Sequence, residues 1–240
     1  MTVQAVLFDI GATLVTGPPL SPVSRLLQIT GWPEQMRPAV SRLIMCRELA
    51  GPDELCRELE QLVRLEDGLP GVAPSLTREQ RQQVAELWQS QRTAARLLPG
   101  ARNAVLGAKT HGFKVGLVSN IWPPYYASFC TAWPGIEQQM DALALSFRVG
   151  VAKPDPRLYQ HALAVLQLPP QQVWMVGDTY YNDILPAIKL GMRTAWVLCR
   201  PDKEADALRG VQEGRLPAPD LVVPDLRQLD LAVLLRANAQ

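Results

Sequence analysis

The chain has 240 residues, of which 48% are hydrophobic and 20% are charged, and its formal net charge is +1. This length suffices for one buried core and a smaller second unit. The near-neutral charge gives no indication that the protein binds nucleic acid or an acidic membrane surface. We expect no signal peptide and no membrane-spanning segment, because no apolar run approaches the roughly 20 residues that a bilayer requires. The four cysteines form no CxxC pair, so we expect reduced thiols in a cytoplasmic protein.

Short apolar runs that are typical of buried parallel strands alternate along the chain with helical patterns. The clearest strand-like runs cover residues 3–8, 113–118, 173–176 and 194–198, with weaker candidates near Leu143 and at 221–223. The helical patterns cover residues 101–109, 156–166, 184–190 and 226–235. This alternation predicts an α/β protein with a Rossmann-like parallel sheet flanked by helices. Ligands of such sheets bind beyond the carboxyl ends of the strands.

A long insertion separates the first two predicted strands. Asp9 and Ser119 are 110 positions apart, whereas a simple βαβ unit takes about 30 residues. The excess contains three apolar stripes at helical spacing: Met36, Val40, Leu43 and Ile44; Leu55, Leu59 and Leu62; Val84, Leu87, Trp88 and Ala95. Proline and glycine breaks flank it at 17–19 and 99–100. We therefore predict an α/β core at residues 1–17 and 98–240, and an inserted all-helical cap at residues 18–97.

Polar motifs follow the predicted strands, each at the point where an apolar run ends. They are Asp9-Ile-Gly-Ala-Thr13, Ser119-Asn120, Lys153-Pro154, and Gly177-Asp178-Thr-Tyr-Tyr-Asn182-Asp183. Asp9, Asp178 and Asp183 would converge in one cleft, where three carboxylates repel one another unless a cation lies between them. Oxygen ligands of this kind suit Mg²⁺. Asp183 alone could simply cap the following helix, but that interpretation does not account for Asp9.

The remaining motif residues fit a site for a phosphoryl group. A lysine such as Lys153 would neutralise charge beside a carboxylate and a phosphate. The Ser119 hydroxyl, with a neighbouring backbone N–H, could donate to phosphoryl oxygens, and Thr13 could contact the same region. Taken singly, Ser-Asn and Lys-Pro dipeptides carry no information. Their order along the chain, each at a strand end, is what gives them weight.

Together these motifs resemble the haloacid dehalogenase superfamily, whose members are mostly phosphatases. The resemblance covers most of the predicted core. It implies that Asp9 is a nucleophile that forms an aspartyl-phosphate, and that Asp9, Asp178, Asp183 and the carbonyl of Gly11 hold Mg²⁺. It further implies that Thr13, Ser119, Asn120 and Lys153 bind a small phosphorylated substrate, and that the insertion is a cap closing over the cleft. The oligomeric state cannot be predicted from the sequence.

The chain departs from the family pattern at Gly11. Phosphatases of the family usually carry an aspartate there, which protonates the leaving oxygen and then activates water; such help is typically worth about 10²–10⁴ in rate. Three alternatives follow. The first is a Mg²⁺-dependent phosphatase that is slow or that acts on good leaving groups, favoured because the fourth motif keeps its carboxylates. The second is a metal-independent 2-haloacid dehalogenase, for which Asp178 and Asp183 would be superfluous. The third is a non-catalytic relative that binds a phosphorylated ligand or a protein.

Overall fold

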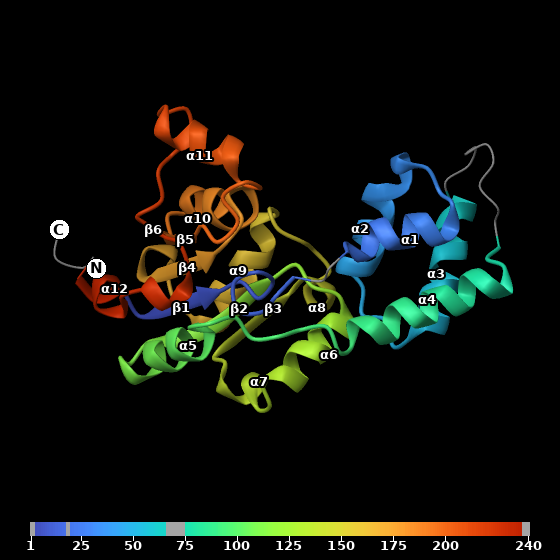
Figure 1. Ribbon diagram of the computed structural model, residues 1–240. Helices are drawn as coiled ribbons and strands as arrows, with labels where there is room; N and C mark the ends of the chain where they lie inside the picture. The colour runs from blue at the N-terminus through green and yellow to red at the C-terminus, as the bar shows by residue number, and fades with distance from the viewer. Residues whose placement is uncertain (1–2, 18–19, 66–74, 237–240) are drawn as a thin grey trace.

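The computed structural model describes residues 3–17, 20–65 and 75–236 (Figure 1). Its centre is a six-stranded sheet in which every pair of neighbouring strands is parallel. The strands are β1 (Ala5–Phe8), β2 (Lys114–Ser119), β3 (Ala142–Leu145), β4 (Val173–Gly177), β5 (Arg193–Val197) and β6 (Leu221–Val223). The four clear strand predictions and the two weaker ones are therefore confirmed, within a residue or two at each end.

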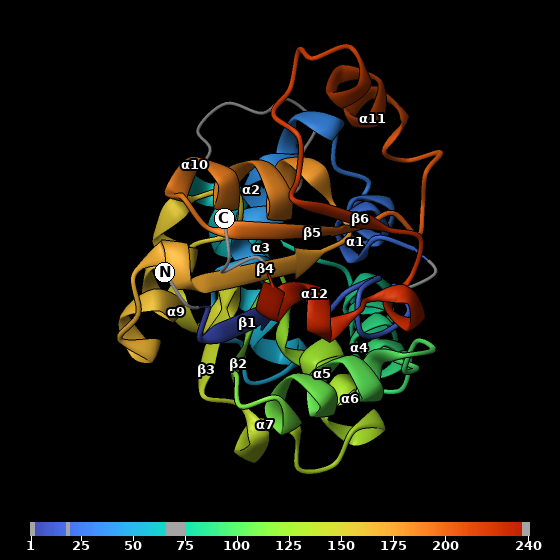
Figure 2. The ribbon, with the colours of Figure 1, turned by 90° about the vertical axis from the view of Figure 1, so that its left-hand side faces the viewer.

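The strand order is β3-β2-β1-β4-β5-β6, which Figure 2 shows with β6 at the top. The chain moves outward from β1 through β2 to β3, then returns to the other side of β1 and continues through β4 to β6. Phe8, the last residue of β1, pairs with Leu117 of β2 and with Val176 of β4. The carboxyl end of β1 therefore lies at the point where the winding direction reverses, which is the usual ligand position in such sheets.

Both faces of the sheet are covered by helices, because successive side chains of a strand point to opposite faces. On β1, Val6 and Phe8 belong to an apolar cluster that includes α5 (Ala101–Thr110), whereas Ala5 and Leu7 pack in a second cluster with α9 (Pro156–Leu166). All four of these β1 side chains are fully buried. Strands that are buried on both faces read as continuous apolar runs, which is the pattern that the sequence shows.

Helix boundaries follow the expected punctuation in most places. Asp155 caps α9 by accepting a hydrogen bond from the backbone N–H of Arg157, and Pro156 occupies the first turn. The helix α10 (Leu185–Leu190) ends at Gly191, whose φ of 82° is left-handed. The predicted helix ranges 156–166 and 184–190 therefore begin and end close to residues that favour helix termini.

The helix predicted over residues 226–235 is wrong in its first half. Leu226–Gln228 forms a 3₁₀ turn, and the α-helix α12 begins only at Leu231 and runs to Arg236. Two aspartates account for the break. Asp225 caps the 3₁₀ turn at the Arg227 N–H, and Asp230 accepts separately from the N–H of Ala232 at 2.8 Å. Each short acidic side chain starts a new turn instead of continuing the previous one.

In the described part of the insertion, four helices lie together at one side of the sheet (Figure 1). They are α1 (Pro22–Thr30), α2 (Arg37–Met45), α3 (Pro52–Leu65) and α4 (Arg78–Gln91). The three apolar stripes correspond to α2, α3 and α4, except that Met36 precedes α2 and Ala95 lies beyond the end of α4. Thr77 and Gln80 form a capping box at the start of α4. The sequence interpretation missed α1. The cap boundaries at residues 18 and 97 stay a prediction, and Pro18 and Pro19 lie outside the described residues.

The insertion is joined to the sheet domain by paired linkers and by aromatic packing. The Thr16 N–H donates to the Arg96 carbonyl at 2.8 Å, so the outgoing and returning chain segments run side by side. Trp88 of α4 packs edge-on against Trp122, with ring centroids 5.6 Å apart. Trp122 immediately precedes α6 (Pro123–Ala132).

The remaining helices are α7 (Ile136–Gln139), α8 (Ser146–Val149) and α11 (Ala205–Gln212), with further 3₁₀ turns at Glu34–Met36 and Pro170–Gln172. Across the described residues, none of the helices has the length and apolar character that crossing a membrane requires.

Candidate active site

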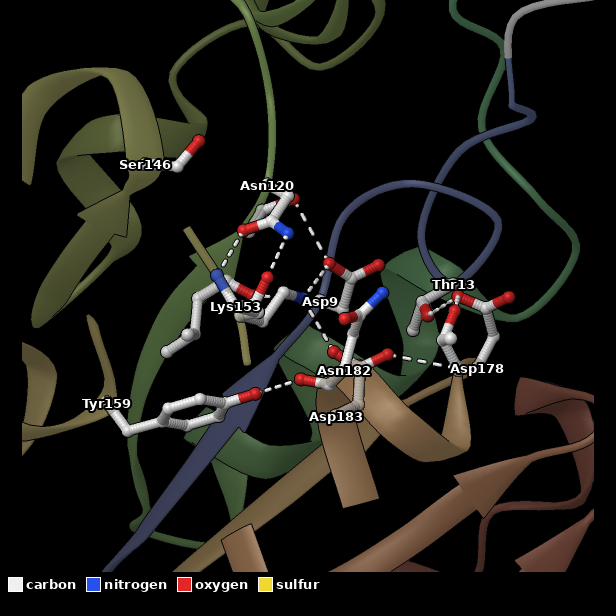
Figure 3. A network of polar contacts seen from close by, with 12 residues as sticks. Asp9, Thr13, Asn120, Ser146, Lys153, Tyr159, Asp178, Asn182 and Asp183 are labelled. Carbon is white, nitrogen blue, oxygen red and sulfur yellow. Dashed lines mark hydrogen bonds and ion pairs between the residues drawn. The ribbon is translucent and has the colours of Figure 1, made fainter. Parts of the chain in front are cut away.

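Asp9 is the first residue after β1 and is nearly buried, with 5% of its surface exposed. Its backbone N–H donates to the carbonyl of Val176 on β4 at 2.9 Å, which continues the ladder one residue beyond the strand. The chain then turns back sharply, with the Leu14 N–H donating to the Ile10 carbonyl at 2.9 Å and Ala12 at a left-handed φ of 58°. This turn places Asp9 and Thr13 on the same side of the loop, above the carboxyl end of the sheet (Figure 3).

Lys153 reaches into the site and links two of the carboxylates. Its Nζ lies 2.6 Å from Oδ1 of Asp9 and 2.5 Å from Oδ1 of Asp183, and it also donates to the Val118 carbonyl at 3.0 Å. All three ammonium protons therefore have an acceptor. Only 3% of the side chain is exposed. Lys153 is thus held as a buried cation between two carboxylates, as the motif analysis expected for a charge-neutralising lysine.

The side-chain amide of Asn120 links the end of β2 to the loop that carries Lys153. Its Nδ2 donates to the Lys153 carbonyl at 2.9 Å, and its Oδ1 accepts from the Lys153 N–H at 2.7 Å. Both ends of the amide are therefore engaged with one peptide segment. This pair fixes the loop that carries Lys153 to the end of β2. The predicted contact of Asn120 with substrate stays a prediction.

The two hydroxyl groups of the motifs also face the carboxylates. The Ser119 hydroxyl donates to Oδ1 of Asp9 at 3.1 Å, and the Thr13 hydroxyl lies 3.5 Å from Oδ1 of Asp178. Both side chains are buried. The structure therefore brings together Asp9, Thr13, Ser119, Lys153, Asp178 and Asp183, which the sequence analysis had assigned to one site. Their roles toward a substrate stay predictions.

Asp178 and Asp183 are positioned by the segment after β4. Residues Tyr180–Ile184 form one π-helical turn, in which the Asp183 N–H donates to the Thr179 carbonyl at 2.7 Å and Oδ2 of Asp183 accepts from the Thr179 N–H at 2.9 Å. Such turns inside helices are frequent at functional sites. A Cβ atom on Gly177 would come within 2.7 Å of Oδ2 of Asp183, so the glycine is what allows Asp183 to approach the strand end.

Asp9, Asp178 and Asp183 form a carboxylate cluster suited to a cation. One oxygen from each lies within 4.8 Å of the others, and all three residues are buried. Burial raises the pKa of Asp178 above its ordinary value, and the charge of Asp9 adds to the effect, while Arg200 opposes it. Burial likewise raises the pKa of Asp183; the positive charge of Lys153 opposes this, whereas Asp9 and Asp178 reinforce it. Burial and mutual repulsion that disfavour ionisation are relieved by a bound cation.

The lysine shows the complementary electrostatic effect. Burial alone would lower the pKa of Lys153, but the negative charges of Asp183 and Asp9 more than offset it and hold the pKa above its ordinary value. Lys153 therefore remains protonated throughout the physiological range. Because its ligands are hard oxygen atoms, the cluster fits Mg²⁺ better than a soft metal.

Three residues of the site were missed by sequence reasoning. Arg200 donates from Nε and Nη2 to Oδ2 of Asp178, the first at 3.1 Å. The indole N–H of Trp196 donates to the backbone carbonyl of Asp178 at 3.0 Å, and the Tyr159 hydroxyl donates to the Asn182 carbonyl (Figure 3). Arg200 could have been found by looking for polar residues just beyond the end of every predicted strand, since it comes three residues after β5. Nothing in the local sequence distinguished Trp196 or Tyr159 from ordinary core aromatics.

Comparison with known proteins agrees with this geometry. Residues 3–191 match the haloacid dehalogenase-like hydrolase family. The chain belongs to that family. The match covers all the site residues described above except Trp196 and Arg200, so the resemblance that the motifs carried is confirmed.

Two of the similar relatives are named as phosphatases. The chain is 32% identical over 165 residues to a phosphoserine phosphatase of Thermus thermophilus, covering 68% of this chain and 59% of that protein. It is 32% identical over 151 residues to a glyceraldehyde 3-phosphate phosphatase of Pyrococcus furiosus, covering 61% and 58%. The matches thus span less than two thirds of these curated relatives.

A solved 2-haloacid dehalogenase from Pseudomonas syringae has a TM-score of 0.63 at 19% identity, with 99% of this chain and 100% of that chain covered. At that identity the likeness shows the fold alone. It confirms the α/β architecture and does not distinguish between hydrolase chemistries.

Proposed function

We propose that this protein is a Mg²⁺-dependent phosphatase that acts on a small phosphorylated metabolite through an aspartyl-phosphate at Asp9. The observation that carries the proposal is the buried cluster of Asp9, Asp178 and Asp183, whose oxygens lie within 4.8 Å of one another. A dehalogenase needs no metal, and such a concentration of carboxylates would serve no purpose in it. The names of the curated relatives support the same class of reaction.

The metal would be held by Asp9, Asp178, Asp183 and the backbone carbonyl of Gly11. When bound, it would supply positive charge to the phosphoryl oxygens. Lys153 donates to one oxygen of Asp9 at 2.6 Å and places a positive charge beside the proposed nucleophile. Ser119 fixes the same oxygen from a second direction at 3.1 Å. Among the described residues, the hydrogen bonds to the Asp9 side chain all go to Oδ1, which leaves Oδ2 to attack phosphorus.

Substrate selection in this proposal belongs to the helical insertion. Helices α1–α4 lie together at one side of the sheet (Figure 1) and would act as a cap that excludes water from the cleft. The two relatives named above are phosphatases of phosphoserine and of glyceraldehyde 3-phosphate, so small three-carbon phosphates are candidate substrates. The four free cysteines are in keeping with a cytoplasmic location.

A phosphate-release screen tests the proposal. The panel includes phosphoserine, glyceraldehyde 3-phosphate, p-nitrophenyl phosphate and acetyl phosphate, each with Mg²⁺ and with EDTA. We expect release that requires Mg²⁺ and that Asp9→Asn abolishes. Halide release from 2-haloacids in EDTA would replace the proposal with dehalogenase activity. If folded protein releases neither phosphate nor halide, the result would instead indicate a binding protein that retains the fold.

A further inference from the structure

The structure leaves open space where the family's second aspartate would lie. A Cβ atom added to Gly11 meets no other atom within 4 Å, and the backbone there is not left-handed. Glycine is therefore not required by the conformation of this loop, in contrast to Gly177, whose Cβ would collide with Asp183. The space two residues beyond Asp9 could hold a longer side chain, and this chain supplies none.

The groups that contact Asp9 do not replace the missing base. Among the described residues, the side chains hydrogen-bonded to Asp9 are Ser119 and Lys153, and both donate. The oxygens of Asp183 accept from Lys153 and from the Thr179 N–H, and Oδ2 of Asp178 accepts from Arg200. Oδ1 of Asp178 accepts from the hydroxyls of Thr13 and Thr179 at 3.5 and 3.4 Å. Each oxygen of these two carboxylates thus already has a hydrogen-bond donor, and both carboxylates would hold the proposed metal. A water attacking a phosphoryl group on Asp9 would find no uncommitted proton acceptor among these residues.

This deficiency affects the two halves of the reaction unequally. In the first half, Oδ2 of Asp9 attacks phosphorus and the bond to the leaving oxygen breaks. An acyl phosphate releases a carboxylate anion, which needs no proton. In the second half, water attacks phosphorus, the bond between phosphorus and Asp9 breaks, and the water must lose a proton. The water must lose this proton whichever phosphoryl donor formed the aspartyl-phosphate. Without a base, the second half is slowed by about 10²–10⁴, whereas the first half is not.

We propose that, with an acyl phosphate as donor, Asp9 remains phosphorylated for most of the catalytic cycle, and that the open space at Gly11 admits the proton acceptor that discharges it. This inference rests on the proposed function and names its substrate class: phosphoryl donors whose leaving group departs as a stable anion. In this inference the protein carries the phosphoryl group on Asp9 until a small external base enters the space at Gly11 and takes the proton of the attacking water.

Intact-protein mass spectrometry tests the accumulation directly. The protein is mixed with acetyl phosphate and Mg²⁺, quenched in acid during steady turnover, and weighed. We expect most of the wild-type protein to carry one phosphoryl group. Gly11→Asp restores the base and should lower the phosphorylated fraction at least tenfold, in line with a gain of about 10²–10⁴ in the second half-reaction. Gly11→Asn is the matched control for Gly11→Asp, because it fills the same space without transferring a proton, and it should carry at least tenfold more adduct than Gly11→Asp.

The outcomes separate this inference from the proposed function. If the wild type releases phosphate in a Mg²⁺-dependent manner but carries no more phosphoryl group than Gly11→Asp, the phosphatase proposal stands and this inference fails. If neither adduct nor phosphate appears with any variant, the phosphatase proposal fails and the inference fails with it. If Gly11→Asp does not fold, a second measurement tests the inference: the rate at which wild type and Gly11→Asn lose the phosphoryl group when an external base is added.

Added base provides that second measurement. Phosphorylated protein is separated from donor, and loss of the adduct is followed with and without formate or imidazole. We expect either base to speed the loss by about tenfold in the wild type, a fraction of the full general-base effect. Gly11→Asn should respond little, because its side chain occupies the space. An equal response of both proteins, or none, would overturn the claim that the space at Gly11 admits the base.

Discussion

Arg200 and Asp178 form an ion pair at the edge of the carboxylate cluster, with both Nε and Nη2 of the guanidinium donating to the same oxygen, Oδ2. Asp178 is 3% exposed, whereas the arginine side chain is 36% exposed. The arginine thus brings a permanent positive charge from the solvent side to a buried carboxylate that the proposed metal would also use. The two cations compete for the same negative charge.

We expect Arg200→Gln to bind Mg²⁺ more tightly than the wild type. Removing a unit positive charge next to a divalent site relieves a repulsion worth about 1–2 kcal/mol for a partly solvated pair, or about tenfold in the dissociation constant. Isothermal titration calorimetry on metal-free protein measures it. Arg200→Lys keeps the charge and should stay close to the wild type. If Arg200→Gln weakened Mg²⁺ binding, the arginine would act mainly by orienting Asp178.

Gly177 and Asp183 make a second prediction, because the strand end and the carboxylate are in contact only while position 177 lacks a side chain. Gly177→Ala should push Asp183 away from Lys153 and destabilise the protein by about 1–3 kcal/mol, the usual cost of overpacking. The stabilisation that Mg²⁺ gives should also be lost. Urea unfolding with and without Mg²⁺ measures both effects.

Gly51→Ala is the matched control for that substitution. A Cβ at Gly51 meets nothing within 4 Å, and its φ is not left-handed. We expect it to unfold at the same urea concentration as the wild type and to retain the Mg²⁺ response. A Gly177→Ala protein that behaved like Gly51→Ala would show that Asp183 has room to move without consequence.

The parts of the site that could be predicted from the sequence are those that local rules determine. Asp9 and Asp178 could be placed because each directly follows a strand that is buried on both faces, and such strands are continuous apolar runs. The family resemblance then gave them roles. The prediction that Lys153 also lies at a strand end is wrong, because α8 separates it from β3. The break between Gln228 and Leu231 was missed because two capping aspartates outweigh an otherwise helical apolar pattern.

The parts that could not be predicted depend on contacts between distant segments. The amide of Asn120, which we predict to contact substrate, also engages the backbone of Lys153, 33 residues away. Arg200 and Asp178 are 22 residues apart and meet because β4 and β5 are neighbours. Pairings of this kind follow from strand order, which alternating apolar patterns leave undetermined.

The carboxylate cluster also makes the stability of the metal-free protein depend on pH. The pKa of Asp178 is raised to about 6 and that of Asp183 to about 7, against an unfolded value of 3.8. A carboxyl whose pKa is raised by folding holds its proton more tightly in the folded state. Its contribution is complete below the unfolded pKa and is lost as the pH rises through the folded pKa. The metal-free protein should therefore become less stable between about pH 4 and pH 7.

Mg²⁺ should reverse this trend, because a cation favours the ionised carboxylates. We expect thermal unfolding in EDTA to occur at a higher temperature at pH 5 than at pH 8, and added Mg²⁺ to raise the midpoint far more at pH 8 than at pH 5. The half-buried Asp155, whose pKa is lowered to about 2 by its hydrogen bonds with Arg157, titrates below this window and does not interfere. Asp183→Asn removes one titrating group and should flatten the dependence in EDTA. Equal stabilisation by Mg²⁺ at both pH values would mean that the ion binds elsewhere than at Asp9, Asp178 and Asp183.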